Sequence, residues 1–272
     1  KMMLSVTMLS SYIYCPRKLY LERVLKFSKF PKAAMIKGTI RHHAYDAIIN
    51  EEESLIKSIQ NNETQNSIFK KYKYKYFALL KEVVKKNKKS LKSVNLGLVD
   101  TFNLNWKYIE KESINRSQEI YLYKNKTGYF GETLWDNLTP KIKSEKRIFS
   151  TNLSLRGIVD QIEVHEKGLQ IPIELKTGKM PQEGVWLGHK YQIGAYMLML
   201  NEKMNTNIDY GYIKYLDYGE KRKVHMNPFF RDEIIEIKDK THNLLNSKII
   251  PDYVEDKNKC ISCELKQKCH SL

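Results

Sequence analysis

The feature that most constrains the fold of this chain is the position of its four cysteines at opposite ends. Cys15 lies near the N-terminus, whereas Cys260, Cys263 and Cys269 fall close together near the C-terminus of the 272-residue chain. No secretion signal accompanies them, and a cytosol keeps thiols reduced, so we expect a metal site rather than two disulfides. Four thiolates suit either Zn²⁺ or an iron–sulfur cluster, and the spacing leaves that choice open. Either site would join the two ends of the chain into one folded unit.

The composition is that of an intracellular globular protein with a large excess of positive charge. Hydrophobic residues make up 42% of the chain, and no apolar run is long enough to cross a membrane. The N-terminal stretch lacks the apolar core of a signal peptide, so we expect a cytoplasmic location. The net charge of +16 favours polyanionic partners such as nucleic acid through phosphate contacts and counterion release. A proteome rich in Lys and Asn would produce the same charge on solvated surfaces, so charge alone does not decide.

Residues 57–92 are dense in lysine, and their aromatic side chains fit two interpretations. The alternation of Lys and Tyr from Lys70 to Tyr76 would suit a strand or a platform on which single-stranded DNA stacks. Spacings of three and four instead favour an amphipathic helix that buries one face, formed by Phe69, Tyr72, Tyr76, Leu80 and Val83. We also expect a helix from about Gly38 to Glu53, whereas residues 93–140 show no clear periodicity.

From about residue 145 the pattern changes to strands. Two apolar segments, Ile148 to Glu163 and Leu169 to Lys176, are separated by the tight-turn sequence Glu166-Lys167-Gly168. The remaining expected elements are a helix from Val185 to Lys203, strands at Tyr210–Tyr215 and Lys221–Met226, and a helix from Asp232 to Ser247.

Three charged residues of the first two expected strands have the types that metal-dependent hydrolysis needs. Asp160 lies on the first strand, and Glu174 and Lys176 stand two apart on the second, so both project to one side. Two carboxylates from paired strands form an oxygen site for Mg²⁺ or Mn²⁺, and a lysine beside it can orient or deprotonate a water. The alternative is a surface ion pair worth about 0–1 kcal/mol. The apolar neighbours Ile173 and Leu175 favour the metal site, because charged groups on covered strands need partners.

Polar residues on two expected helices are further candidates for this site. Gln192 and Tyr196 are four apart, hence on one helix face, where they can contact a phosphate, a water at the metal or a base. For Tyr196 the alternative is a half-buried ring in the core. His189 lies one turn earlier, where it could share this helix face; the alternative for His189 is a surface position. On the early helix, a neutral imidazole from His42, next to His43, would add a nitrogen ligand that favours Mn²⁺ over Mg²⁺.

Taken together, these motifs resemble one family, the CRISPR-associated RecB-like iron–sulfur exonucleases. The segment from Ser10 to Leu21, with Cys15 before Pro16, is similar to the N-terminal cysteine motif of that family. The other motifs follow in the family's order and approximate spacing: Gly38-x3-His42, Gly157-x2-Asp160, Glu174-x-Lys176, Gln192-x3-Tyr196 and Cys260-x2-Cys263-x5-Cys269. Residues 54–140 match none of the family's motifs and are interpreted as an insertion.

The resemblance implies a fold and a set of site residues. The implied fold is α/β, a PD-(D/E)xK (restriction-endonuclease-like) nuclease core in which helices flank a mixed sheet. The implied cofactors are Mg²⁺ or Mn²⁺ and a [4Fe–4S] cluster, with zinc as the alternative to the cluster. The implied ligands of the divalent ion are His42, Asp160, Glu174 and the Leu175 carbonyl. The implied catalytic residues are Asp160, Glu174, Lys176, Gln192 and Tyr196, and the implied cluster ligands are Cys15, Cys260, Cys263 and Cys269.

The same comparison of motifs divides the chain into four segments. Residues 1–53 form an N-terminal helical segment with the first cluster cysteine and the motif histidine, and residues 54–140 a mainly helical inserted subdomain. Residues 141–250 form the RecB-type nuclease core, and residues 251–272 the cysteine-rich cluster segment.

The implied activity is metal-dependent exonucleolytic cleavage of DNA, with single-stranded ends preferred, in spacer acquisition beside the CRISPR integrase. Two alternatives remain open: a RecB-like nuclease of recombination or repair outside CRISPR, and a catalytically idle DNA-binding scaffold. The complete His, Asp, Glu, Lys, Gln and Tyr set favours a nuclease over a scaffold. A helicase–nuclease is disfavoured because the sequence contains no G-x4-G-K-[ST] phosphate loop.

Overall fold

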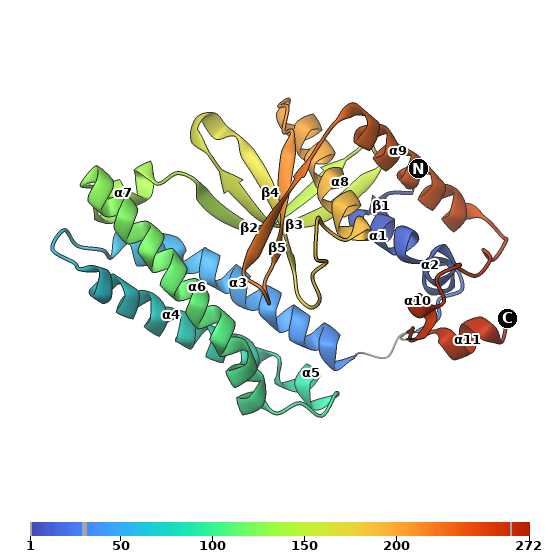
Figure 1. The fold of residues 1–272 in the computed structure, drawn as a ribbon, viewed down its shortest axis with the longest axis horizontal. Helices are drawn as coiled ribbons and strands as arrows, with labels where there is room; N and C mark the ends of the chain where they lie inside the picture. The colour runs from blue at the N-terminus through green and yellow to red at the C-terminus, as the bar shows by residue number, and fades with distance from the viewer. Residues whose placement is uncertain (1, 29–31, 262) are drawn as a thin grey trace.

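A mixed sheet flanked by helices on both sides forms the centre of the protein, as predicted (Figure 1). The computed structural model describes residues 2–28, 32–261 and 263–272. Within these residues six strands form one sheet in the order β1-β3-β4-β5-β6, with β2 pairing with β3. Their bounds are β1 Leu4–Ser5, β2 Lys141–Ser150, β3 Leu155–Val164, β4 Gln170–Lys176, β5 Tyr210–Tyr215 and β6 Glu220–His225.

The pairing of β3 leaves a fork in the sheet. β3 pairs antiparallel with β2 from Leu155 to Val164, except at Asp160, but with β4 only from Gln161 to Val164. At its other end β3 pairs parallel with β1, through Leu155 and Arg156. The four residues between, 157–160, therefore have neither β1 nor β4 opposite them, and the space that this opens holds the candidate site.

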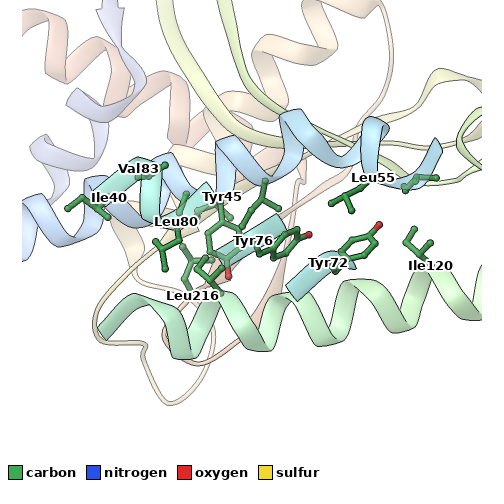
Figure 2. Packing of buried hydrophobic residues seen from close by; sticks show 14 of the residues in the cluster. Ile40, Tyr45, Leu55, Tyr72, Tyr76, Leu80, Val83, Ile120 and Leu216 are labelled. Atoms are coloured by element: carbon green, nitrogen blue, oxygen red, sulfur yellow. The ribbon is translucent and has the colours of Figure 1, made fainter. Parts of the chain in front are cut away.

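One side of the sheet carries a lobe of long helices. This lobe contains α3 (Ala33–Lys57), α4 (Gln65–Lys86), α5 (Lys88–Lys92), α6 (Leu98–Thr127) and α7 (Gly131–Asn137). Its interior is apolar and aromatic, with Tyr72, Tyr76 and Leu80 of α4 packed between α3 and α6 (Figure 2). The amphipathic helix predicted around Tyr72 is confirmed, and the strand alternative is wrong: the segment is helical, with Tyr72 and Tyr76 buried on one face and Tyr74 exposed.

The other side of the sheet is covered by α8 (Leu187–Met204), which packs against α1 (Val6–Tyr14) and α9 (Pro228–Asn246). α8 confirms the helix predicted there, and β5, β6 and α9 agree with the predicted elements to within a few residues. The two chain ends then meet: α2 (Pro16–Arg23) lies beside α10 (Asn258–Ile261) and α11 (Lys266–His270). Lys18 pairs with Glu264 at 2.8 Å across this junction.

One sequence expectation needs correction. The segment expected as one strand from Ile148 to Glu163 is two strands, because the chain reverses in a turn at residues 151–154 and Ser150 pairs with Leu155. The turn is Thr151-Asn152-Leu153-Ser154, and its three polar residues are a turn signal that the expected single strand ignores. Residues 98–127, which showed no periodicity, form the single long helix α6. None of the helices in the described part of the chain is long and apolar enough to cross a membrane.

Candidate active site

Asp160 stands where β3 and β4 separate, and the backbone of β4 fixes its carboxylate. Its Oδ2 accepts a hydrogen bond of 2.8 Å from the Leu175 amide. This amide is available because the pairing of β4 with β3 ends at Ile173. Its Oδ1 lies 3.3 Å from Nδ1 of His42 on α3. Asp160, predicted on the first strand, and His42, predicted on the early helix, are therefore neighbours, although 118 positions separate them in the sequence.

Glu174, Lys176 and Gln192 form a second group on β4 and α8. The Lys176 ammonium donates to Glu174 Oε1 at 2.9 Å and to Gln192 Oε1 at 2.8 Å. The Gln192 amide donates to the same Glu174 Oε1 at 2.5 Å. The structure thus brings the predicted Glu, Lys and Gln into one hydrogen-bonded triad, beside Asp160 across the fork.

The second carboxylate oxygen of Glu174, Oε2, is buried without a hydrogen-bond partner among the described residues. The side chain is only 4% exposed, and burial raises its pKa to about 7, against the opposing charge of Lys176. A buried oxygen without a partner is unfavourable by about 1–3 kcal/mol, so such an atom calls for an explanation. A divalent cation at Oε2 would supply one, and carboxylate and imidazole donors are the set that Mg²⁺ and Mn²⁺ accept.

The pKa of His42 depends on the same carboxylates. Burial lowers the pKa of the imidazole, but the hydrogen bond and the charge of Asp160, together with the charge of Glu174, outweigh burial and raise the pKa overall. His43 on the next position is exposed to solvent. Of the two adjacent histidines, only His42 therefore faces the carboxylates.

The remaining predicted residues of α8 have defined contacts. Tyr196 is buried and its hydroxyl donates to the Ile158 carbonyl at 2.7 Å, in the unpaired stretch of β3. His189 was expected at the surface, but it is partly buried and its Nδ1 lies 3.2 Å from the Tyr215 hydroxyl. Burial, with the nearby Lys176 charge, lowers the His189 pKa to about 3, so the imidazole is neutral at physiological pH.

Arg41 is a residue of this region that no sequence motif singled out. Its guanidinium is buried, donating from Nε to Asn105 Oδ1 of α6 at 2.7 Å and from Nη1 to Asp217 Oδ1 at 3.2 Å. Asp217 Oδ2 in turn accepts from the Gly178 amide at 2.7 Å, just after β4. Arg41 therefore links the helix that carries His42 to the loop that follows the strand carrying Glu174.

The four cysteines come together from the two chain ends. All of them have free thiols, are partly buried and line one small cavity between α2 and the α10–α11 segment. Two of the sulfurs accept N–H donors: Cys15 from the Lys18 amide at 3.3 Å and Cys269 from Arg17 Nε at 3.1 Å. Burial raises the pKa of Cys15, and the other three thiols raise it further. Donors aimed at sulfur suit thiolates that hold a metal.

Neither at the fork nor at the cysteines do the described side chains form a coordination sphere. Over residues 2–28, 32–261 and 263–272, no three His, Cys, Asp or Glu side chains are grouped closely enough to hold a metal ion. The donor types, the partnerless Glu174 Oε2 and the N–H donors to sulfur fit the two implied groups, and the roles of the individual residues stay predictions.

Comparison with known proteins gives the family. The PD-(D/E)XK nuclease superfamily matches residues 3–270, nearly the whole chain. The chain belongs to that superfamily, and the strand–strand–helix group of Asp160, Glu174, Lys176 and Gln192 lies within the matched region.

Three curated relatives are similar to parts or most of the chain. The "CRISPR-associated exonuclease Cas4/endonuclease Cas1 fusion" of Leptospira interrogans is 29% identical over 52% of this chain and 28% of its own length. The "DNA replication ATP-dependent helicase/nuclease JHS1" of Arabidopsis thaliana is 21% identical over 92% of this chain, but only 19% of its own. The "CRISPR-associated exonuclease Csa1" of Saccharolobus solfataricus is 22% identical over 54% of this chain and 58% of its own length. The chain thus spans less than two thirds of each of these relatives.

A solved structure also aligns with most of the chain. The crystal structure of SSO0001 covers 94% of both chains at 15% identity, with a TM-score of 0.34, which is too low to support any conclusion.

Proposed function

We propose that this protein is a Mg²⁺- or Mn²⁺-dependent deoxyribonuclease that acts on single-stranded DNA ends as an exonuclease. The observation that carries the proposal is the buried, partnerless Oε2 of Glu174 on a strand that forks from the strand of Asp160. Membership of a nuclease superfamily supports it. A catalytically idle scaffold would have no need to place this carboxylate beside Asp160, Lys176 and Gln192.

In this proposal His42, Asp160, Glu174 and the Leu175 carbonyl hold the divalent ion. The ion would polarise the scissile phosphate and provide the nucleophile at neutral pH. Asp160 is held by the Leu175 amide through Oδ2, which leaves Oδ1 directed toward His42. Gln192 and Lys176 both engage Oε1 of Glu174, which leaves Oε2 available.

Lys176 is the proposed catalytic lysine. Its ammonium is held between Glu174 and Gln192, so it has a fixed position from which to orient a water or stabilise phosphate charge. Tyr196 acts differently, because its hydroxyl is engaged by the Ile158 carbonyl and its ring packs under Gly157. We propose that it holds the open stretch of β3 in place for Asp160.

We propose that Cys15, Cys260, Cys263 and Cys269 hold a [4Fe–4S] cluster. Their shared cavity and the N–H donors to Cys15 and Cys269 support a thiolate site. The cluster would tie α2 to the C-terminal segment. The cavity of the cysteines and the groove at the fork have no lining residue in common, so the role that we propose for the cluster is structural.

The proposed biological setting is CRISPR spacer acquisition beside the integrase. The Leptospira interrogans relative, in which an exonuclease Cas4 is fused to an endonuclease Cas1, supports this setting. A second candidate is a replication or repair nuclease outside CRISPR, supported by the similarity to a DNA replication helicase/nuclease over 92% of this chain. Binding of this protein to the Cas1 encoded in the same genome, measured by gel filtration of the mixture, would separate the two settings.

The activity is tested with purified protein on end-labelled single-stranded DNA and on a blunt duplex of the same sequence. We expect single nucleotides or short products from the single strand with Mn²⁺ or Mg²⁺, and none with EDTA. Absence of cleavage with every divalent ion, in protein that contains its full iron complement, would contradict the proposed function.

A further inference from the structure

Beside the candidate site, β2 and β3 carry an exposed strip of four side chains. On β2 these are Arg147 and Phe149, which pair directly opposite Ile158 and Arg156 of β3. Opposed residues of an antiparallel pair project from the same face, and so do residues two apart along a strand. The four side chains therefore share one face, and we call them the β2–β3 strip.

The β2–β3 strip faces away from the helix that covers the sheet. A side chain at Gly157 would lie 2.6 Å from the Tyr196 ring, so the positions between strip residues point toward α8. The strip itself points the other way and is left uncovered. Phe149 is 59% exposed and Ile158 45% exposed, although both lie within the paired part of β2 and β3. Large apolar groups in such positions are candidates for a partner's surface.

The strip opens directly into the candidate site. All four of its residues line one groove together with Asp160, Glu174 and Gln192. Asp160 follows Ile158 by two positions, which corresponds to about 7 Å along a strand. A strand of nucleic acid with its scissile phosphate at Asp160 would therefore run along the strip as it leaves the site.

The charges on the strip suit such a strand. Neither Arg147 nor Arg156 has an ion-pair or side-chain hydrogen-bond partner within the described residues, and both are exposed. In contrast, the buried Arg41 and the partly buried Arg116 are paired with carboxylates. Arg147 is two positions from Phe149 along β2 and Arg156 is directly opposite it on β3, so two free guanidinium groups adjoin one exposed ring. Such groups suit the phosphates on the two sides of a base that stacks on the ring.

We propose that the β2–β3 strip binds single-stranded DNA next to the cleavage site, with Phe149 stacking on a base and Arg147 and Arg156 binding the adjacent phosphates. A ring that projects from a strand can stack only on a base whose face is open, which a duplex does not offer. The strip thereby selects single strands. This inference rests on the proposed function for its orientation, because it places the scissile phosphate at Asp160.

The test measures binding without cleavage, using the full-length protein with its metal cluster and a fluorescent oligothymidine in EDTA. We expect Phe149→Ala to weaken binding about tenfold, equivalent to about 1.4 kcal/mol and within the range for loss of one stacked base. Phe149→Trp should retain the affinity, because it restores a stacking ring. Phe229→Ala is the matched control: that ring is 82% exposed on α9, and its loss should leave binding unchanged.

The arginines are tested by the salt dependence of the same binding. Each of Arg147→Ala and Arg156→Ala should reduce the slope of log K against log[salt] by about 0.7, the value for one phosphate contact on a single strand. Arg231→Ala, which removes an exposed arginine from α9, should leave the slope unchanged.

The outcomes separate this inference from the proposed function. Wild-type affinity of Phe149→Ala, or an equal loss in Phe229→Ala, overturns the strip as a DNA surface even if the protein cleaves DNA. So does a change in oligomeric state of Phe149→Ala, by light scattering, without a change in DNA binding, because the strip would then be a contact between copies. If Phe149→Ala loses affinity but no divalent ion supports cleavage, the strip stands and the nuclease proposal fails.

Discussion

The helix pair α4–α6 and the strand pair β3–β4 both bury polar side chains, but the hydroxyl groups of α6 and the charged groups of the fork find their partners differently. In α6 the buried hydroxyl groups bond to a carbonyl one turn back in the chain, as Thr101 does to Gly97 and Ser117 to Ile114. At β3–β4 the bonds join different elements, and Glu174 Oε2 keeps no partner among the described residues. The hydroxyl groups of α6 are thus satisfied within their own helix, whereas the charged groups of the fork depend on partners from other elements.

The two regions therefore differ in what their buried polar groups contribute, packing in the helical lobe and chemistry at the fork. Small hydroxyl groups in α6 take up little space, so the large rings of α4, Tyr72 and Tyr76, pack against that helix, and the Tyr72 hydroxyl is left without a partner among the described residues. Glu52 of the helical lobe also keeps a buried oxygen without a described partner, but among the candidate catalytic groups Asp160, Glu174, Lys176 and Gln192 only Glu174 does so. Substitutions in the helical lobe should therefore change stability, and substitutions at the fork should change activity.

The largest expected effect is at the fork. Asp160→Ala and Glu174→Ala should each abolish cleavage while leaving single-stranded DNA binding in EDTA nearly unchanged, because the carboxylates hold the ion and contribute little phosphate affinity. Cleavage and anisotropy assays measure the two effects, and Glu236→Ala on α9 is the control carboxylate. Near wild-type cleavage by either variant would show that the fork is not the active site.

The next effect concerns the junction of the chain ends. Cys15→Ser should reduce the iron content and lower Tm by about 10 °C or more, since each kcal/mol lost shifts Tm by about 2–4 °C in a chain of this size. Serine keeps an N-cap acceptor for the Lys18 amide at the start of α2, so the loss would report the metal ligand alone. Iron analysis and calorimetry give the result, and full iron with an unchanged Tm would remove Cys15 from the ligand set. A colourless protein with one zinc would replace the cluster and keep the ligand set.

Arg41→Ala tests the link between the two regions. Removing a buried guanidinium leaves Asp217 and Asn105 without their partner, which should lower the free energy of unfolding by about 3 kcal/mol. Because His42 is the next residue on α3, the Mn²⁺ concentration needed for half-maximal cleavage should also rise. Arg41→Lys, which keeps charge toward Asp217, should recover part of both effects. Loss of stability with unchanged Mn²⁺ dependence would confine Arg41 to a packing role.

The smallest effect belongs to the helical lobe. The Tyr72 hydroxyl is buried without a partner among the described residues, so Tyr72→Phe should leave stability unchanged or raise it by up to about 1 kcal/mol. Urea unfolding measures the change, and cleavage should match the wild type. A loss of more than about 1 kcal/mol would mean that the hydroxyl has a partner, such as a bound water.

Local patterns allowed much of the fold to be predicted. The helix around Tyr72 followed from apolar spacings of three and four, and the strand with Glu174 and Lys176 from its apolar run before a helix. α6 was missed because its buried face is Thr101, Asn105, Ile109, Ser113, Ser117, Ile120 and Lys124. That face keeps helical spacing, but an apolar pattern cannot detect it, since most of its residues are polar.

The sequence by itself determined which residues are candidates for chemistry, because each motif spans only a few positions along the chain. Only the tertiary structure decided how they meet: His42 beside Asp160, and Arg41 joined to Asn105 and Asp217, 64 and 176 positions away. It also decided that Arg147 and Phe149 share a face with Arg156 and remain uncovered. Burial and contact between distant residues depend on how the sheet forks and what packs on each face, and no local spacing encodes that.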